Sequence, residues 1–347
     1  MPSYKEINAG KRTGRRTVKG LLRLNQALDN TVPAKTLDQT LLLASWNIRE
    51  FGNQKSGGRE DEPLFYLAEI LSRFDLIAVQ EVRDNLDALD RLMAILGGWW
   101  RYLVSDVTLG KQGNMERHAY VYDTRKLSFG GLVGELIPPM TKEAGLLTSN
   151  FAFARTPYLA GFRAGWFKFT ICTQHLYYGE SKPDDQQRQK ESETIVDLLH
   201  KRMRSKDRWA NNTILLGDFN VFSTKDRTFL ALEKGRFHIP AGLRGQYTNA
   251  KLDKPFDQMA FMAPDVDRQI DLARAGVFPF FKYVYRDSDR AEYLPKADDK
   301  TYREWRTYKM SDHLPIWVEL GVDFSTDYLE RKANPSTPGK AKDGATE

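Results

Sequence analysis

The stretch YKMSDHLPIWVEL, residues 308–320, is the last of four apolar segments that carry polar side chains at one end. The other three are LLLASWNIREFG (41–52), FDLIAVQEVRDN (74–85) and TILLGDFNVFS (213–223). A short apolar run bounded by polar residues is typical of a buried strand that emerges into a loop. The four segments therefore predict strands whose ends bring Asn, Asp, Glu and His to one rim. Hard oxygen donors beside a histidine indicate a magnesium-type site with an acid–base group, as phosphodiester hydrolysis requires.

Amphipathic segments alternate with these strands. Helices are predicted at PLFYLAEILSRF (63–74), at LDALDRLMAIL (86–96) and from Pro183 to about Arg204. Further strands are predicted at HAYVYDTRKL (118–127) and GWFKFTICTQHL (165–176). This alternation indicates an α/β architecture whose strands are buried on both faces.

Composition limits the class of protein. The chain has 347 residues, 41% of them hydrophobic, and can bury a large core. Its 52 basic and 46 acidic residues give a net charge of +6, which is compatible with a polyanionic partner without requiring one. The single cysteine, Cys172, excludes an intrachain disulfide and suits a reducing compartment, so we expect a cytoplasmic protein. We expect neither a membrane segment nor a signal peptide, although secretion by another route stays open.

The two ends differ from the middle. Residues 1–38 form a basic N-terminal extension, in which LLRLNQAL (21–28) could make a short helix. Either this arm contacts nucleic acid or it is a plain solvated extension. Residues 39–322 form the expected catalytic domain, and the polar tail 323–347 is expected to be disordered.

Seven motifs follow one another between Leu41 and Leu320: NIREFG, VQEVRDN, GNMERHAYVYDTRKLS, FARTP, GDFN, FDQMAF and SDHLP. In this order they resemble the endonuclease/exonuclease/phosphatase superfamily, and within it the deoxyribonuclease I-like proteins. The resemblance implies a four-layer α/β/β/α sandwich, in which two packed β-sheets are flanked by helices and a cleft lies at one edge.

The resemblance also implies a metal site. Asn47 and Glu81 would hold Mg²⁺, with Mn²⁺ or Ca²⁺ as alternatives. A carboxylate at the end of an apolar strand, as at Glu81, is by itself a natural ligand for such an ion. Asp312 would help to bind the metal or to position the nucleophile.

His175 and His313 both follow apolar strand-like runs, and two imidazoles beside carboxylates suggest an acid–base pair. By resemblance, Glu116 orients His175 and Asp257 orients His313. One imidazole would activate water and the other would protonate the leaving oxygen, and the sequence does not decide which does which.

The GDFN motif supplies two more candidates. Asp218 and Asn220 occupy alternate positions at a strand terminus, so their side chains are expected on the same side. Asp218 could align the water or bind a second metal, and Asn220 could donate a hydrogen bond to the scissile phosphate.

Three arginines at motif positions, Arg49, Arg83 and Arg155, are expected to bind phosphate oxygens without reading bases. By resemblance, Arg83 is the candidate for the minor groove. Asn114 stands where close deoxyribonuclease I relatives carry a tyrosine that packs against a sugar, so groove contact should be weaker or differently made.

The stretch 279–308 is rich in aromatic and basic residues. It could form a stacking surface for single strands, or its rings could close the core.

The favoured function is a metal-dependent, monomeric DNA endonuclease or nickase with little sequence specificity, and RNA stays open as a substrate. The alternatives are a phosphatase or phosphodiesterase of the same superfamily acting on a lipid or inositol phosphate, and a binding module that has lost catalysis.

Overall fold

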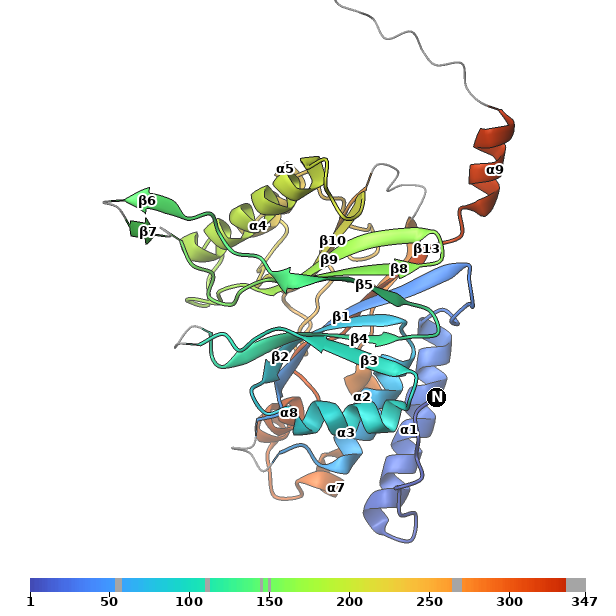
Figure 1. Ribbon diagram of the computed structural model, residues 1–347. Coiled ribbons are helices and arrows are strands. Elements are labelled where there is room, and N and C mark those ends of the chain that lie inside the picture. The colour runs from blue at the N-terminus through green and yellow to red at the C-terminus, as the bar shows by residue number, and fades with distance from the viewer. Residues whose placement is uncertain (54–57, 110–112, 144–145, 149–150, 264–269, 335–347) are drawn as a thin grey trace, which may run out of the picture.

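The computed structural model describes residues 1–53, 58–109, 113–143, 146–148, 151–263 and 270–334. Two β-sheets pack face to face, with α1, α2, α3 and α8 outside one sheet and α4 and α5 outside the other (Figure 1). The predicted four-layer α/β/β/α sandwich is therefore confirmed.

The first sheet has six strands, in the order β12 (Ile270–Val277), β13 (Ile316–Gly321), β1 (Thr40–Phe51), β2 (Leu76–Arg83), β4 (Glu116–Asp123) and β3 (Trp100–Val104). The second has five, in the order β11 (Asp257–Met262), β10 (Asn212–Asp218), β9 (Phe167–His175), β8 (Tyr158–Ala164) and β5 (Ser128–Glu135). A separate pair joins β6 (Thr141–Glu143) to β7 (Leu146–Thr148). The helices are α1 (Arg12–Thr31), α2 (Asp61–Ser72), α3 (Asp87–Leu96), α4 (Gln186–Arg204), α5 (Arg227–Lys234), α7 (Arg290–Tyr293), α8 (Asp299–Lys309) and α9 (Ser325–Ala333), with short 3₁₀ turns η1 (Phe280–Lys282) and η2 (Asp287–Asp289).

Strand β1 shows why the four apolar segments of the sequence contain few polar residues. Leu41 and Leu43 point into the core between the two sheets, whereas Leu42, Ala44 and Trp46 join the core beneath α1, α2 and α3. Successive side chains of a strand alternate between its faces, and helices and a second sheet cover both faces here. Because both faces are buried, the strand lacks the alternation of apolar and polar residues that a half-exposed strand shows.

The N-terminal segment is more structured than the sequence indicated. Instead of a short helix at 21–28, α1 runs for 20 residues and packs against α2. Its buried face starts with the small residues Gly14, Thr17 and Gly20 and continues with Leu21 and Leu24. A search for large apolar residues misses this face, because its first half is made of small side chains: Gly14 lies against the backbone of Asn8, and Gly20 lies against Tyr66 of α2.

The structure favours one of the two alternatives for residues 279–308 and alters the expectation for the C-terminal tail. The stretch 279–308 consists mostly of short helices, and Phe280, Tyr285 and Tyr302 are almost fully buried, so its rings close the core. Residues 325–333 of the expected disordered tail form the exposed helix α9. The rest of the predicted disorder, 335–347, lies outside the described residues. No helix within the described part of the chain is both long and apolar enough to cross a membrane.

The contact between α1 and α2 can be tested at Gly20. In the interior of a helix, alanine normally stabilises the helix by about 1 kcal/mol relative to glycine. A Cβ at Gly20, however, would overlap the ring and hydroxyl of Tyr66 on α2. We expect Gly20→Ala to lower the free energy of unfolding by about 1–3 kcal/mol, the usual cost of overpacking. Denaturant unfolding measures this, with the exposed Gln26→Ala on the same helix as control. A Gly20→Ala protein as stable as wild type would mean that α1 does not pack here.

Candidate active site

Strand register in the second sheet aligns three candidate residues. His175 at the end of β9 is the parallel neighbour of Asp218 on β10, and Asp218 is the antiparallel neighbour of Asp257 on β11. The apolar residues that precede them in β9 and β10 are buried on both faces, which fixes the register. The three residues therefore lie next to one another on adjacent strands at the edge of the sheet.

Asn47 and Glu81 come from the other sheet, on the parallel strands β1 and β2. The pairing of β2 with β1 and with β4 shifts around Glu81, which has a φ of +61°. Such an irregularity can redirect a side chain at a strand end. The Glu81 carboxylate accepts hydrogen bonds from Asn47 Nδ2 at 3.0 Å and from the Glu50 backbone N–H at 2.8 Å.

Each of the two histidines contacts a buried carboxylate through Nδ1. His175 Nδ1 lies 3.0 Å from Glu116 Oε2, and His313 Nδ1 lies 2.8 Å from Asp257 Oδ2. Thr248 Oγ1 donates to the same Asp257 oxygen at 2.7 Å. A carboxylate on Nδ1 fixes the ring orientation and leaves Nε2 facing the site.

The two Nε2 atoms converge on Asp218. Its Oδ2 lies 3.4 Å from His175 Nε2 and 3.6 Å from His313 Nε2, and it accepts a 3.0 Å hydrogen bond from Asn47 Nδ2. Its Oδ1 accepts from the Asn220 backbone N–H at 2.9 Å. Asp218 therefore joins both histidines to the Asn47–Glu81 pair.

The burial of these groups shifts their pKa values in different directions. Desolvation raises the pKa of Asp218, but the two neighbouring histidines outweigh it and lower the pKa overall. Desolvation also opposes the charging of His313, yet Asp257 and Asp218 hold its pKa well above the usual range. For Glu116, His175 and Arg155 overcome the cost of burial and lower the pKa.

The pKa of Glu81 shifts in the opposite direction from those of Asp218 and Glu116. Its pKa is raised, first by desolvation and then by the nearby charge of Glu116. Glu81, Glu116 and His175 each present a ligand atom, and these atoms lie within 4.8 Å of one another. Excess negative charge of this kind is what a divalent cation would neutralise.

The donor set fits a hard divalent cation. Asn47 Oδ1 is buried and has no hydrogen-bond partner, although the amide of the same side chain donates to Glu81. A buried carbonyl oxygen without a partner is costly unless something binds it. Asn47 and Glu81 thus both carry oxygen atoms of the type that a hard cation binds. Asp218, Asp257 and His313 make a second group with ligand atoms within 4.8 Å, although both histidine nitrogens are already engaged.

Two predicted residues border this centre, and neither side chain contacts Asp218. Asp312 has a 44% exposed side chain and belongs to neither ligand group in the described residues; its Oδ2 is 3.9 Å from Arg49 Nη1. Asn220 lies past the end of β10 with a φ of +49°, so the strand alternation expected from Asp218 does not continue. Its amide donates to the Leu176 carbonyl at 2.8 Å.

The arginines are held by protein partners. Arg155 Nε donates to Glu116 at 2.5 Å. Arg83 is buried and donates to the Asn114 carbonyl, and the Asn114 amide donates to Glu116 at 2.8 Å. These side chains brace the carboxylate that contacts His175, so Arg83 is not presented as the exposed groove-inserting residue that the sequence suggested.

Arg49 is the arginine at the rim. Its guanidinium lies 3.7 Å from the centre of the Tyr308 ring and donates to Glu304 at 3.2 Å. Its side chain is 19% exposed, which leaves part of the guanidinium accessible beside Asp312.

Sequence inspection missed three supporting residues. Ser311 Oγ donates to the Asn47 carbonyl at 2.6 Å and accepts from the backbone N–H groups of Arg49 and His313. Trp46 Nε1 donates to the His313 carbonyl at 2.9 Å, and Thr248 contacts Asp257 as described. Ser311 stands inside the SDHLP motif and could have been noted there, whereas nothing in the sequence around Thr248 points to its role.

Comparison with known proteins agrees with this geometry. The chain is 37% identical over 97 residues to deoxyribonuclease-1 of Rattus norvegicus, covering 26% of this chain and 33% of that protein. It is 27% identical over 195 residues to deoxyribonuclease-1 of Bos taurus, covering 53% of this chain and 62% of that protein. The matches thus span less than two thirds of either relative.

Solved structures share the fold. An endonuclease/exonuclease/phosphatase family protein from Bacteroides thetaiotaomicron superposes with a TM-score of 0.57 at 19% identity, covering 83% of this chain and 97% of that one. A mannosyl-6-phosphatase from the same organism gives a TM-score of 0.55 at 19% identity, covering 81% and 99%. The sequence profile of the Endonuclease/Exonuclease/phosphatase family matches residues 44–313, which include all the described site residues. The chain therefore belongs to the endonuclease/exonuclease/phosphatase family.

Proposed function

We propose that this protein is a divalent-metal-dependent phosphodiesterase that hydrolyses the DNA backbone with little sequence specificity. One observation carries the proposal. Two imidazoles, each backed by a buried carboxylate on Nδ1, present Nε2 to the same oxygen of Asp218. An in-line displacement at phosphorus needs a proton acceptor for the attacking water and a proton donor for the leaving oxygen.

Each residue has a distinct task in this proposal. Glu116 and Asp257 fix the orientation of His175 and His313, so that their Nε2 atoms can accept or donate a proton. Asp218 lies between the two Nε2 atoms and aligns the attacking water. Asn220 and Asp312 stay candidates for contact with the phosphate and for positioning the nucleophile.

Asn47 and Glu81 would hold the cation, with Asp312 as a further candidate ligand. Mg²⁺ is favoured because the ligand atoms of Asn47 and Glu81 are hard oxygens, and Mn²⁺ or Ca²⁺ are alternatives. A bound cation would supply charge stabilisation for the phosphoryl oxygens in the transition state.

DNA is favoured as substrate because the curated relatives reported above are deoxyribonucleases. Arg49, whose side chain is partly exposed, would contact a phosphate, which carries no base information. Cleavage should therefore be nearly independent of sequence and should weaken with salt.

Metal binding is tested at Glu81. We expect Glu81→Gln to lose hydrolysis and also the rise in melting temperature that Mg²⁺ or Mn²⁺ gives the wild type, because the carboxylate charge is removed. Thermal unfolding with and without each ion measures this apart from activity. Glu330→Gln, on the exposed helix α9, is the control. Wild-type hydrolysis that continues undiminished in chelator would exclude the metal role.

The histidines are tested by substitution. His175→Ala and His313→Ala should each lose about 10²–10⁴-fold in kcat on a plasmid substrate, as general acid–base groups do. If both act on one displacement, the double variant should be far less impaired than the product of the two losses. His200→Ala is the control, since His200 bonds the Gly235 carbonyl beside α5. Near-normal turnover in either single variant would give that histidine a structural role only.

Substrate choice is tested with a panel of supercoiled plasmid, linear duplex, single-stranded DNA, RNA and an inositol phosphate. We expect relaxed plasmid circles to appear first, cut at many sequences, with rates that fall as salt rises. Sequencing of the cut ends and a salt series measure both properties. Release of phosphate from the inositol phosphate without any DNA cleavage would favour a phosphatase of the same family.

A further inference from the structure

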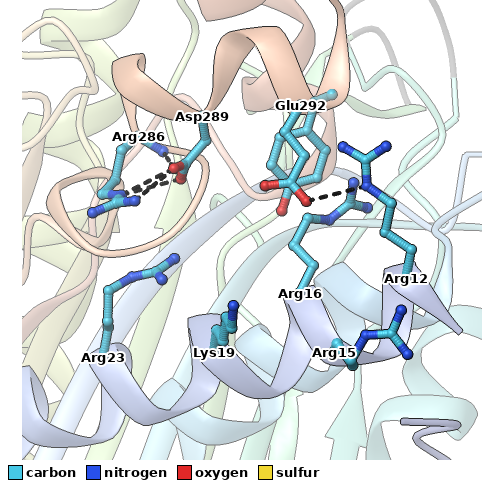
Figure 2. Close-up of a pocket in the computed structure, with 9 residues that line it drawn as sticks. Arg12, Arg15, Arg16, Lys19, Arg23, Arg286, Asp289 and Glu292 are labelled. Carbon is cyan, nitrogen blue, oxygen red and sulfur yellow. Dashed lines mark hydrogen bonds and ion pairs between the residues drawn. The ribbon is translucent and has the colours of Figure 1, made fainter. Parts of the chain in front are cut away.

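A basic cavity lies on the far side of the first sheet from the second, between α1 and the segment that carries η2 and α7. It has a volume of about 370 Å³, and its wall includes the basic side chains Arg12, Arg15, Arg16, Lys19, Arg23 and Arg286. Figure 2 shows the basic side chains of α1 in one row, with Arg286, Asp289 and Glu292 opposite them. None of these residues belongs to the site described above.

The row follows from helical spacing. Positions 12, 15, 16, 19 and 23 share one face of α1, next to the face buried against α2. From Arg12 to Arg23 the helix rises about 16 Å at 1.5 Å per residue. The first turn of α1 contains no acidic residue, so the positive end of the helix dipole adds to these charges.

Only part of this charge is neutralised. Arg16 pairs with Glu62, Arg286 pairs with Asp289, and Arg12 Nε lies 3.9 Å from Glu292 Oε1. In the part of the chain that the structure describes, Arg15 and Arg23 bond backbone carbonyls and form no ion pair with a carboxylate. Lys19 is exposed and likewise pairs with no described carboxylate. Three cations of this row, Arg15, Lys19 and Arg23, therefore form no ion pair with a carboxylate of the described residues.

The cavity is close to the candidate active site through α8. Arg306 on that helix pairs with Asp287, the neighbour of Arg286 in the cavity wall. One residue further on, Thr307 accepts a hydrogen bond from Arg49 at the rim of the site. Helix α8 thus contacts both the segment that carries Arg286 and the Arg49 side chain.

We propose that the basic face of α1 binds the phosphate backbone of a DNA strand outside the cleft, as a second contact with the same substrate. The inference rests on the proposed function for the identity of that substrate. One strand of B-form DNA carries a phosphate about every 3.4 Å of helix axis and winds around that axis, so a straight row of cations about 16 Å long can contact a few consecutive phosphates. A compact anion enclosed in the cavity would meet Asp289 and Glu292, whereas a strand laid along α1 contacts mainly the cations.

The test compares three double variants. Arg15→Ala with Lys19→Ala removes two charges, and Arg15→Lys with Lys19→Arg preserves them. The control, Lys190→Ala with Lys201→Ala, removes two exposed charges from α4 in the opposite helix layer. Thermal unfolding checks that each protein folds, and Lys19→Ala alone serves if the double variant does not.

Binding of a labelled 30-base-pair duplex is measured in chelator, where hydrolysis does not interfere. Removal of Arg15 and Lys19 should weaken binding about tenfold at low salt. It should also reduce the slope of log affinity against log salt by about 2, or about 1 for Lys19→Ala alone. The charge-preserving variant should bind like wild type, and the α4 variant should keep the affinity and slope of wild type. Hydrolysis of bis(p-nitrophenyl) phosphate, which is too small to reach α1, should be unchanged in all variants.

The outcomes separate this proposal from the proposed function. An unchanged affinity and salt slope in the variant that lacks both charges overturns the second contact, even if the enzyme cuts DNA. A reduced slope in a protein that hydrolyses neither DNA nor the small diester supports the contact and rejects the nuclease function. A melting temperature raised by pyrophosphate only when Arg15 and Lys19 are present, with unchanged DNA binding, would assign the cavity to a compact anion and overturn the proposal.

Discussion

The buried carboxylate of Asp218 is the group on which the rest of the site depends. Its Oδ2 is approached by one amide nitrogen and two imidazole nitrogens, from Asn47, His175 and His313. A buried charge without such partners would cost several kcal/mol, and a buried imidazolium would be as unfavourable without the carboxylate. The two sheets must therefore meet with their strand ends in register, because Asn47 comes from one sheet and His175 from the other.

The sequence predicts this centre well for a physical reason. Strands buried on both faces are mostly apolar, so a group of polar residues near the end of such a run marks the edge of the sheet. Asn47, Glu81, His175 and Asp218 all stand in such groups, although the buried polar residues Ser45, Gln80 and Gln174 precede the first three. The partners that hold them are less visible. Ser311 and Thr248 act through hydroxyl groups from loops, and a single serine or threonine in a loop has no pattern that distinguishes it.

The same reasoning explains what could not be predicted. The small-residue face of α1 carries no apolar period, so a helix that packs along its length looked like a basic extension. Arg83 follows a metal-ligand motif, as an exposed phosphate contact would, but its guanidinium turns inward to the Asn114 carbonyl. An arginine at a strand end can reach in either direction, and the fold of the neighbouring loop decides which.

Several residues with strained backbone conformations lie near Asp218 and the other residues of the candidate active site. Glu50, Glu81, Asn114, Met115 and Asn220 all have positive φ, in or next to the candidate site. For residues other than glycine, this conformation costs on the order of 1 kcal/mol or more each and persists only where surrounding contacts impose it. Here the contacts are visible: the Glu50 N–H donates to Glu81, the Asn220 N–H donates to Asp218, and the Asn114 amide donates to Glu116. Three of these residues, Glu50, Asn220 and Asn114, donate to a carboxylate of the site, so their conformations and the placement of the carboxylates are maintained by the same hydrogen bonds. Acidic groups that are fixed in this way need little rearrangement to hold a divalent cation.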